Sequence, residues 1–169
     1  DLVRSRGLGD VYKRQVQQFL RNVAWGDVDF LILDLPPGTG DIQLTIVQTA
    51  ELDGVVVVTT PQEVALIDAR KAIGLFERVE TPILGIIENM SYFQCPSDGK
   101  IYHIFGEGGG EREAAKLGVP LLGKIPLDIS TRFGGDEGRP VALEDPGQNP
   151  VSAAFRQVAE QCARVVLDR

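Results

Sequence analysis

The sequence predicts an α/β domain built on a doubly wound, mostly parallel sheet. Short aliphatic segments bounded by Gly, Pro or Asp alternate along the chain with segments of helical periodicity. This alternation is typical of parallel strands joined by crossover helices. The expected strands are Val28–Asp34, Gly54–Thr59, Pro82–Glu88 and Leu121–Ile125.

The first of these strands carries the most informative residues of the chain. Phe30 to Leu33 are four consecutive apolar residues, which predicts a buried parallel strand that ends at Asp34. Ligands of open α/β sheets bind at this carboxyl edge. The following turn, Pro36 to Gly40, has glycines that leave backbone N–H groups accessible. A carboxylate and free amides in this order suit Mg²⁺ and a terminal phosphate, although Asp34 could also be a simple turn former or helix cap.

Capping signals predict where the helices begin. Asp41 is expected to cap the helix after the first strand. Thr60 is expected to cap the next one, with Pro61 at the first helical position and Glu63 completing a capping box. Asn149 is expected to open the last helix in the same way. The buried stripe of the helix after Pro61 is expected to include Ala65, Ile67, Ala72, Ile73 and Phe76.

The composition is that of one ordinary domain. Its 169 residues, with 43% hydrophobic and 24% charged residues, can build a real core. A net charge of −7 disfavours a nucleic-acid partner. No apolar run approaches the ~18 residues of a membrane span, so no membrane partner is expected. Two cysteines cannot form a disulfide framework, which predicts a cytoplasmic protein.

The longest irregular stretch, Asn89 to Gly110, is unusual inside a compact domain and is often functional in such cases. Its glycine run, Gly106 to Gly110, does not have the spacing of a dinucleotide-binding loop, so a helix entry or a hinge is expected there. His103 is the only histidine and is expected to be a loop or surface residue.

Five motifs along the chain jointly resemble one family. From about Val16 to the C-terminus, the sequence resembles the Mrp-type (ApbC-like) iron–sulfur cluster carriers, which belong to the MinD/ParA-like class of P-loop ATPases. The matching motifs, in order, are Asp34-Leu-Pro-Pro-Gly-Thr-Gly-Asp41, Thr59-Thr-Pro-Gln-Glu63, Glu88-Asn-Met-Ser-Tyr-Phe93, Ile104-Phe-Gly-Glu-Gly-Gly109 and Leu122-Gly-Lys-Ile-Pro-Leu-Asp128.

The resemblance assigns roles around ATP. It implies that Asp34 serves the Mg²⁺ ion and Gly38 the γ-phosphate. It also implies that Asn89 contacts the base, since an amide offers both a donor and an acceptor. Backbone from Pro126 through Leu127 to Asp128 would close the other side of the base. The alternative for Asn89 is a loop asparagine that satisfies local backbone groups.

The cysteine pattern departs from the family. Members that carry clusters have a C-x-x-C pair, through which a homodimer binds one [4Fe–4S] cluster with four thiolates. In this chain the pair reads Cys95 and Asp98. Carboxylates are hard ligands where iron–sulfur chemistry favours soft ones. Cluster binding is then weakened and labile, or the scaffold has another task, and Cys95 could equally be an ordinary free thiol. Cys162 is expected in the core.

The phosphate-binding loop of the class is not found in this sequence. Neither G-x-x-x-x-G-K-[ST] nor the lysine-rich variant occurs. Residues 16–169 are therefore interpreted as the C-terminal half of a P-loop ATPase domain, without its N-terminal strand and phosphate loop. Residues 1–15 are interpreted as a foreign or disordered leader. Whether the chain is itself an enzyme stays open, because ATP hydrolysis by the chain alone is not expected.

The expected function is that of an ATP-dependent iron–sulfur cluster carrier. In its intact form it would bind and hydrolyse ATP and transfer a [4Fe–4S] cluster to apo iron–sulfur proteins. One alternative is a positioning or partitioning ATPase of the MinD/ParA type without a cluster. Another is an inactive fragment.

Overall fold

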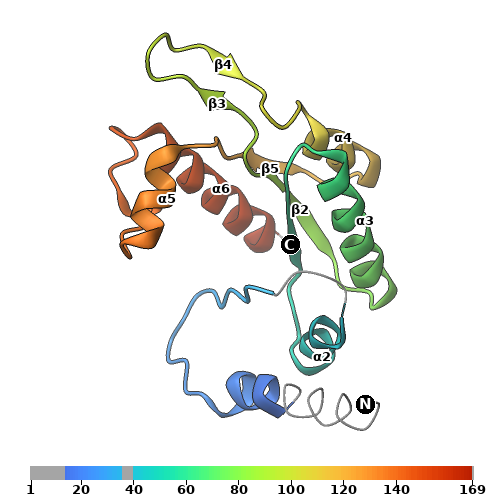
Figure 1. The fold of residues 1–169 in the computed structure, drawn as a ribbon. Coiled ribbons are helices and arrows are strands. Elements are labelled where there is room, and N and C mark those ends of the chain that lie inside the picture. Colours follow the sequence, from blue (N-terminus) through green and yellow to red (C-terminus); the bar gives the residue numbers. More distant parts are fainter. Residues whose placement is uncertain (1–13, 36–39, 169) are drawn as a thin grey trace, which may run out of the picture.

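A computed structural model describes residues 14–35 and 40–168, except for the side chains of Asp41 and Ile42 (Figure 1). Its main sheet has three parallel strands in the order β1-β2-β5. A separate antiparallel hairpin, β3–β4, projects beyond one end of this sheet. The strand bounds are β1 Val55–Thr59, β2 Ile83–Glu88, β3 Phe93–Gln94, β4 Ile101–Tyr102 and β5 Leu121–Lys124.

Helices cover both faces of the main sheet, as the sequence predicts. Figure 1 shows α3 and α4 on one face and α6 on the other, which makes the sheet doubly wound. Within the described residues, no helix is both long enough and apolar enough to span a bilayer. Residues 14–22 are helical, and the further helices are α2 Asp41–Thr49, α3 Glu63–Arg78, α4 Gly109–Leu117, α5 Ile129–Asp136, the 3₁₀ helix η1 Val141–Leu143 and α6 Pro150–Leu167.

The core lies around the central strand β2. Ile86 of β2 is 0% exposed and packs with Val57, Ile73 and Ala114 from β1, α3 and α4. On the opposite face, α6 lies close to β5. A Cβ atom at Gly123 would stand 2.5 Å from Val158 Cγ2, so only glycine permits this approach.

The helix starts agree with the sequence in one case and differ in two. Asn149 caps α6, because its Oδ1 accepts hydrogen bonds from Val151 N and Ser152 N. The predicted cap at Thr60 is wrong: α3 begins at Glu63 after Gln62, with no side-chain cap. The predicted cap at Asp41 is also wrong, since Asp41 is the first residue of α2 and Gly40 precedes it as the cap.

The predicted buried stripe of α3 is wrong at Ile67. Ile73 and Phe76 are buried as expected, but Leu66 takes the position expected for Ile67, which is exposed. Leu66 lies seven residues before Ile73, about two helical turns, and therefore shares its face, whereas Ile67 is rotated away from it.

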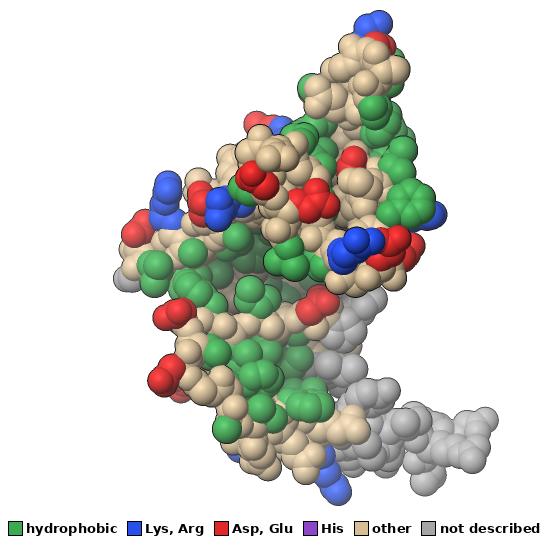
Figure 2. All heavy atoms as spheres, turned by 90° about the vertical axis from the view of Figure 1, so that its left-hand side faces the viewer, with side chains coloured by type: hydrophobic (Ala, Val, Ile, Leu, Met, Phe, Trp, Pro, Cys, Tyr) green, Lys and Arg blue, Asp and Glu red, His purple; other side chains and the backbone are tan. Residues whose placement is uncertain are grey.

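The predicted strand Val28–Asp34 is not present. Residues 28–35 have no regular structure, and Figure 1 shows them at the end of the sheet where β1 begins. A strand needs neighbours to pair its backbone groups, and the described sheet contains only β1, β2 and β5. Large apolar side chains of this segment are exposed instead: Val28, Phe30, Leu31 and Ile32. Figure 2 shows the face that looks to the left in Figure 1, and hydrophobic side chains gather there around a hollow.

Two isoleucine substitutions separate a buried strand from an exposed segment. Ile86→Ala should lower the free energy of unfolding by about 2–5 kcal/mol, because it empties a closed part of the core. Ile32→Ala removes the same atoms from a side chain that is 88% exposed and should change stability by less than about 0.5 kcal/mol. Urea denaturation of both variants measures this, and equal losses would contradict the described placement of residues 28–35.

Candidate functional site

The carboxyl ends of the three parallel strands form one connected edge. Asn89, just after β2, donates its backbone N–H to the Thr59 carbonyl oxygen at the end of β1 (2.7 Å). On the other side, Ile125 N donates to the Glu88 carbonyl oxygen (2.9 Å), and Ser91 N donates to the Ile125 carbonyl oxygen (3.0 Å). The pairing of β2 with both neighbours therefore continues past the strand ends.

Asn89 stands on this edge with its amide partly engaged. The residue is half-buried, and its Oδ1 accepts a hydrogen bond from Met90 N at 2.9 Å. Met90 has a φ of 53°, so the chain turns sharply here. The local hydrogen bond is the one expected of a loop asparagine. The Nδ2 group of Asn89 is the part of the side chain that can donate to a base.

The segment Pro126–Asp128 lies next to the Asn89 loop. Leu127 N donates to the Tyr92 carbonyl oxygen at 2.7 Å, and Leu127 forms a parallel bridge with Phe93. Asp128 caps α5 by accepting from Thr131 N (2.9 Å), and Ser130 also donates to it. The structure thus brings Asn89 and Pro126–Asp128 together on one edge, as the resemblance implies.

The side chain of Asp128 caps α5, and its hydrogen bonds lower its pKa. Burial raises the pKa of the Asp128 carboxyl, but hydrogen bonds from Ser130 and Thr131 together outweigh it, and the net pKa lies below its ordinary value. The carboxylate is therefore committed to the start of α5.

Asp34 is not brought to the same edge. It is exposed and lies within the irregular segment 28–35, which Figure 1 shows near the end of the sheet where β1 begins, whereas Asn89 follows the carboxyl end of β2. Gly38, the other residue assigned to the phosphates, lies outside the described residues. The arrangement therefore joins the residues assigned to the base and separates them from Asp34.

The hairpin β3–β4 presents Cys95 at its tip. Cys95 N donates to the Lys100 carbonyl oxygen (2.9 Å), and Gly99 N donates to the Cys95 carbonyl oxygen (2.8 Å). The Sγ atom lies 3.1 Å from the Ser97 hydroxyl. That contact, helped by the N–H groups of Ser97 and Asp98, lowers the pKa of the Cys95 thiol. Hydrogen-bond donors around sulfur favour the thiolate, the form that binds metals.

The two cysteines have opposite environments. Cys162 is half-buried in α6, and burial raises the pKa of its thiol. The prediction that Cys162 lies in the core is wrong, because the residue is half-buried and is not part of the cluster around Ile86. Within residues 14–35 and 40–168, no three side chains of His, Cys, Asp or Glu gather as a metal site.

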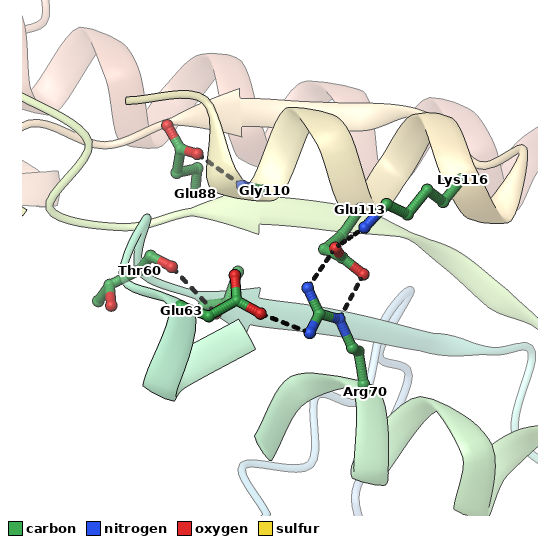
Figure 3. Close-up of polar contacts among 8 residues, drawn as sticks. Thr60, Glu63, Arg70, Glu88, Gly110, Glu113 and Lys116 are labelled. Atoms are coloured by element: carbon green, nitrogen blue, oxygen red, sulfur yellow. Dashed lines mark hydrogen bonds and ion pairs between the residues drawn. The ribbon is translucent and has the colours of Figure 1, made fainter. Parts of the chain in front are cut away.

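Glu88 is the residue of this edge that the sequence reasoning passed over. Its side chain is 0% exposed, yet it is acidic and ends the central strand. Its Oε1 accepts from the Ser91 hydroxyl (2.5 Å), and its Oε2 accepts from Gly110 N (2.7 Å). Figure 3 shows the carboxylate pointing at the start of α4. The sequence feature that indicates Glu88 is an acidic residue at the end of an otherwise apolar strand.

The glycine run before α4 is a helix entry, as expected. Gly108 has a φ of 65° and precedes the first residue of α4. A Cβ atom at Gly109 would stand 2.5 Å from the Pro61 carbonyl oxygen, so glycine is required for this close approach. The carboxylate of Glu88 already occupies the start of the helix through Gly110 N, where an external phosphate would bind.

A charged cluster joins α3 to α4. Arg70 of α3 donates to both carboxylate oxygens of Glu113 in α4 (2.9 and 2.7 Å) and to Glu63 (2.7 Å), and Lys116 also pairs with Glu113 (Figure 3). The hydrogen bond from Arg70, followed by that from Lys116, lowers the pKa of Glu113 to about 2. The cluster joins the two helices on the same face of the sheet, and each of its charged groups has a partner within it.

Comparison with solved structures defines the class. The chain resembles an Archaeoglobus fulgidus nucleotide-binding protein in complex with ADP, with 43% identity and a TM-score of 0.69 over 76% of this chain and 53% of that one. It also shares the fold of the Pyrococcus furiosus cell division ATPase MinD, with 24% identity and a TM-score of 0.66 over 90% of this chain and 59% of that one. The class is that of MinD-like P-loop NTPases.

The chain belongs to the ParA family of NUBPL iron-transfer P-loop NTPases, which it matches over residues 6–163. The iron–sulfur cluster carrier protein of Pyrococcus furiosus is 48% identical over 153 residues, which are 90% of this chain and 51% of that protein. This chain thus spans about half the length of that relative. The resemblance found in the five motifs is confirmed.

The charged cluster predicts an acid-sensitive stability. The folded pKa of Glu113, about 2, lies below its ordinary value of 4.5. Its contribution is therefore fully present above the ordinary pKa and is lost as the pH falls toward the folded one. In Glu113→Gln the loss of stability on acidification should be smaller than in the parent chain.

Urea unfolding between about pH 6 and pH 2 tests this. Glu160→Gln, an exposed substitution on α6, is the matched control and should keep the parent's pH dependence. An unchanged slope in Glu113→Gln would contradict the assignment.

Proposed function

We propose that the protein is an ATP-dependent iron–sulfur cluster carrier that passes a cluster to apo-proteins. The main support is the proximity of two features on one edge of the sheet. Asn89 and Pro126–Asp128, which the resemblance assigns to the base, lie at the root of the hairpin that carries Cys95. Family membership and relatives named iron–sulfur cluster carrier proteins support the same conclusion.

The nucleotide would be recognised at its base by this edge. Asn89 Nδ2 donates to the base, and the backbone of Pro126–Asp128 covers its other side. This use of one side-chain amide and one backbone segment suits a flat heterocycle with a donor and an acceptor on its rim. The ADP complex of the Archaeoglobus fulgidus protein supports a nucleotide as the ligand.

The residues assigned to the phosphate end of the nucleotide are not part of this edge. Asp34 for Mg²⁺ and Gly38 for the γ-phosphate stay predictions. The described arrangement, in which Asp34 lies away from the edge that carries Asn89, does not fit a shared Mg–ATP site. A bound Mg²⁺ ion would supply charge neutralisation at the phosphates.

The cluster would be cargo held at the hairpin tip. The hydrogen bonds to Cys95 Sγ favour a thiolate, which is a soft ligand for iron. One chain offers a single thiolate there, so two copies would have to meet at their hairpins to provide two. A homodimer, and a [4Fe–4S] cluster between its subunits, are therefore part of the proposal. Asp98 in place of a second cysteine makes the site labile, which suits release to a recipient.

A positioning ATPase of the MinD type is the second candidate. The presence of Asp98 where cluster-binding relatives have a cysteine favours it. Its output would be binding to a partner rather than metal transfer. Both candidates place the protein in the cytoplasm, which agrees with two free thiols in the described residues.

Iron binding separates the two candidates. The full-length protein, reconstituted anaerobically with iron and sulfide, should become brown and lose its visible absorbance in Cys95→Ser. The control is Cys162→Ser, which should keep the colour, because Cys162 lies in α6 away from the hairpin. Parent protein without bound iron would favour the positioning ATPase.

Base recognition is tested at Asn89. Loss of one hydrogen bond to the base is worth about 1 kcal/mol, so Asn89→Ala should weaken ATP binding roughly fivefold. It should also reduce the preference for ATP over GTP. The control Asn22→Ala changes an exposed asparagine at the end of the helical residues 14–22. Calorimetric titration of the full-length protein measures both constants, and equal affinity in the two variants would refute the base contact.

A further inference from the structure

We infer that Glu88 and Ser91 form a buried clamp that fixes the Cys95 hairpin to the nucleotide edge, and that Glu88 is a positioning residue for cluster transfer. The inference rests on the proposed function for its role in transfer. The clamp itself is defined by contacts at the ends of β2 and β5 and at the start of α4.

Packing alone does not explain why a carboxylate, that of Glu88, is fully buried at the end of β2. Removing a carboxylate from water is costly unless its oxygens are hydrogen-bonded. Both oxygens of Glu88 have such partners, the Ser91 hydroxyl and the Gly110 amide, and the latter lies at the positive end of the α4 dipole. An apolar residue would fill the same volume at lower cost. The carboxylate is instead placed where it joins the loop after β2 to α4.

Three polar groups of Ser91, its N–H, its hydroxyl and its carbonyl oxygen, each contact a different segment. Its N–H donates to the Ile125 carbonyl oxygen (3.0 Å), and its hydroxyl donates to Glu88. Its carbonyl oxygen lies 3.3 Å from His103 Nδ1, on the segment that returns from the hairpin. Ser91 is 3% exposed. It therefore ties the outgoing and returning arms of the hairpin to the end of the sheet.

The clamp lies between the two sites of the proposed function. Asn89 follows Glu88 directly, and Cys95 lies four residues beyond Ser91 along the same strand path. The bridge between Phe93 and Leu127 connects this path to the backbone that faces the base. Any shift of the 89–93 segment on nucleotide binding would move the hairpin with it. Binding at one site then changes affinity at the other, and the coupling acts in both directions.

Two matched serine substitutions test the clamp in the chain without nucleotide or iron. Ser91→Ala removes the hydroxyl that donates to Glu88. Ser152→Ala removes an equally buried hydroxyl (1% exposed), which donates to the Glu144 carbonyl oxygen near the start of α6. Both should lower the melting temperature by similar amounts.

Amide hydrogen exchange and thiol alkylation provide the decisive measurements. Only Ser91→Ala should speed the exchange of the backbone amides at position 91 and at Leu127 and the alkylation of Cys95, by about fivefold for one lost hydrogen bond. Alkylation is followed in a Cys162→Ala background, so that one thiol reports. Equal rates in the two serine variants would overturn the clamp.

Glu88 itself is tested by a pair of variants. Glu88→Gln can still accept from Gly110 N and donate to the Ser91 oxygen, so its hairpin exchange should stay near that of the parent. Glu88→Ala loses both contacts and should exchange faster than Ser91→Ala. Fast exchange in Glu88→Gln, or slow exchange in a folded Glu88→Ala, would contradict the role of the hydrogen bonds.

The role of the clamp in cluster transfer is tested by the visible circular dichroism of the bound iron–sulfur cluster. In the reconstituted full-length protein, ATP should change the visible circular dichroism of the cluster in Ser152→Ala but not in Ser91→Ala. The same response in both variants would overturn the positioning role while leaving the carrier function intact. A parent protein that binds no iron would refute the carrier function, and the exchange results would then still decide the clamp.

Discussion

The parallel pairing of β2 on both sides is the constraint on which this molecule depends. β1 and β5 are aligned only through β2, and their carboxyl ends therefore reach one edge. The hydrogen bonds continue past the strands, from Asn89 to Thr59 and from Ser91 to Ile125. Two loops that are distant in sequence thereby become one surface. The core around Ile86 stabilises this alignment, because every helix of that face packs on the same strand.

Polar groups inside the fold are used to hold elements at defined positions. Glu88 joins the end of β2 to the start of α4, and the Arg70–Glu113 pair joins α3 to α4 further along. Neither arrangement follows from the burial of apolar area, which has no direction. Hydrogen bonds to carboxylates do have direction, and they determine how α4 sits on the sheet. The close approach of Gly109 to Pro61 is possible because no side chain intervenes.

The hairpin combines a rigid root with a short, exposed tip. At the root, backbone bonds to the 125–127 segment continue the order of the sheet. At the tip, the Ser97 hydroxyl and the N–H groups of Ser97 and Asp98 lower the pKa of the half-buried Cys95 thiol and favour its thiolate. In the proposed function, this combination would let Cys95 hold iron at a fixed place. The hollow with hydrophobic side chains in Figure 2 lies on the face where residues 28–35 run outside the sheet.

The sequence by itself determined the family, the alternation of strands and helices, and the start of α6 at Asn149. These features depend on local signals: order of motifs, short aliphatic runs, and a cap whose partners are two and three residues away. It also indicated Asn89 and Pro126–Asp128 as one site, through resemblance rather than through spacing.

Only the tertiary structure decided the rest. Phe30 to Leu33 has the composition of a buried strand, yet it lies outside the sheet, because a strand forms only where a neighbour pairs with it. Thr60 has the pattern of a cap, but the helix begins at Glu63. The role of Glu88 depends on Gly110, 22 residues away. Pairing, packing and long-range hydrogen bonds are properties of the folded chain, and no local pattern contains them.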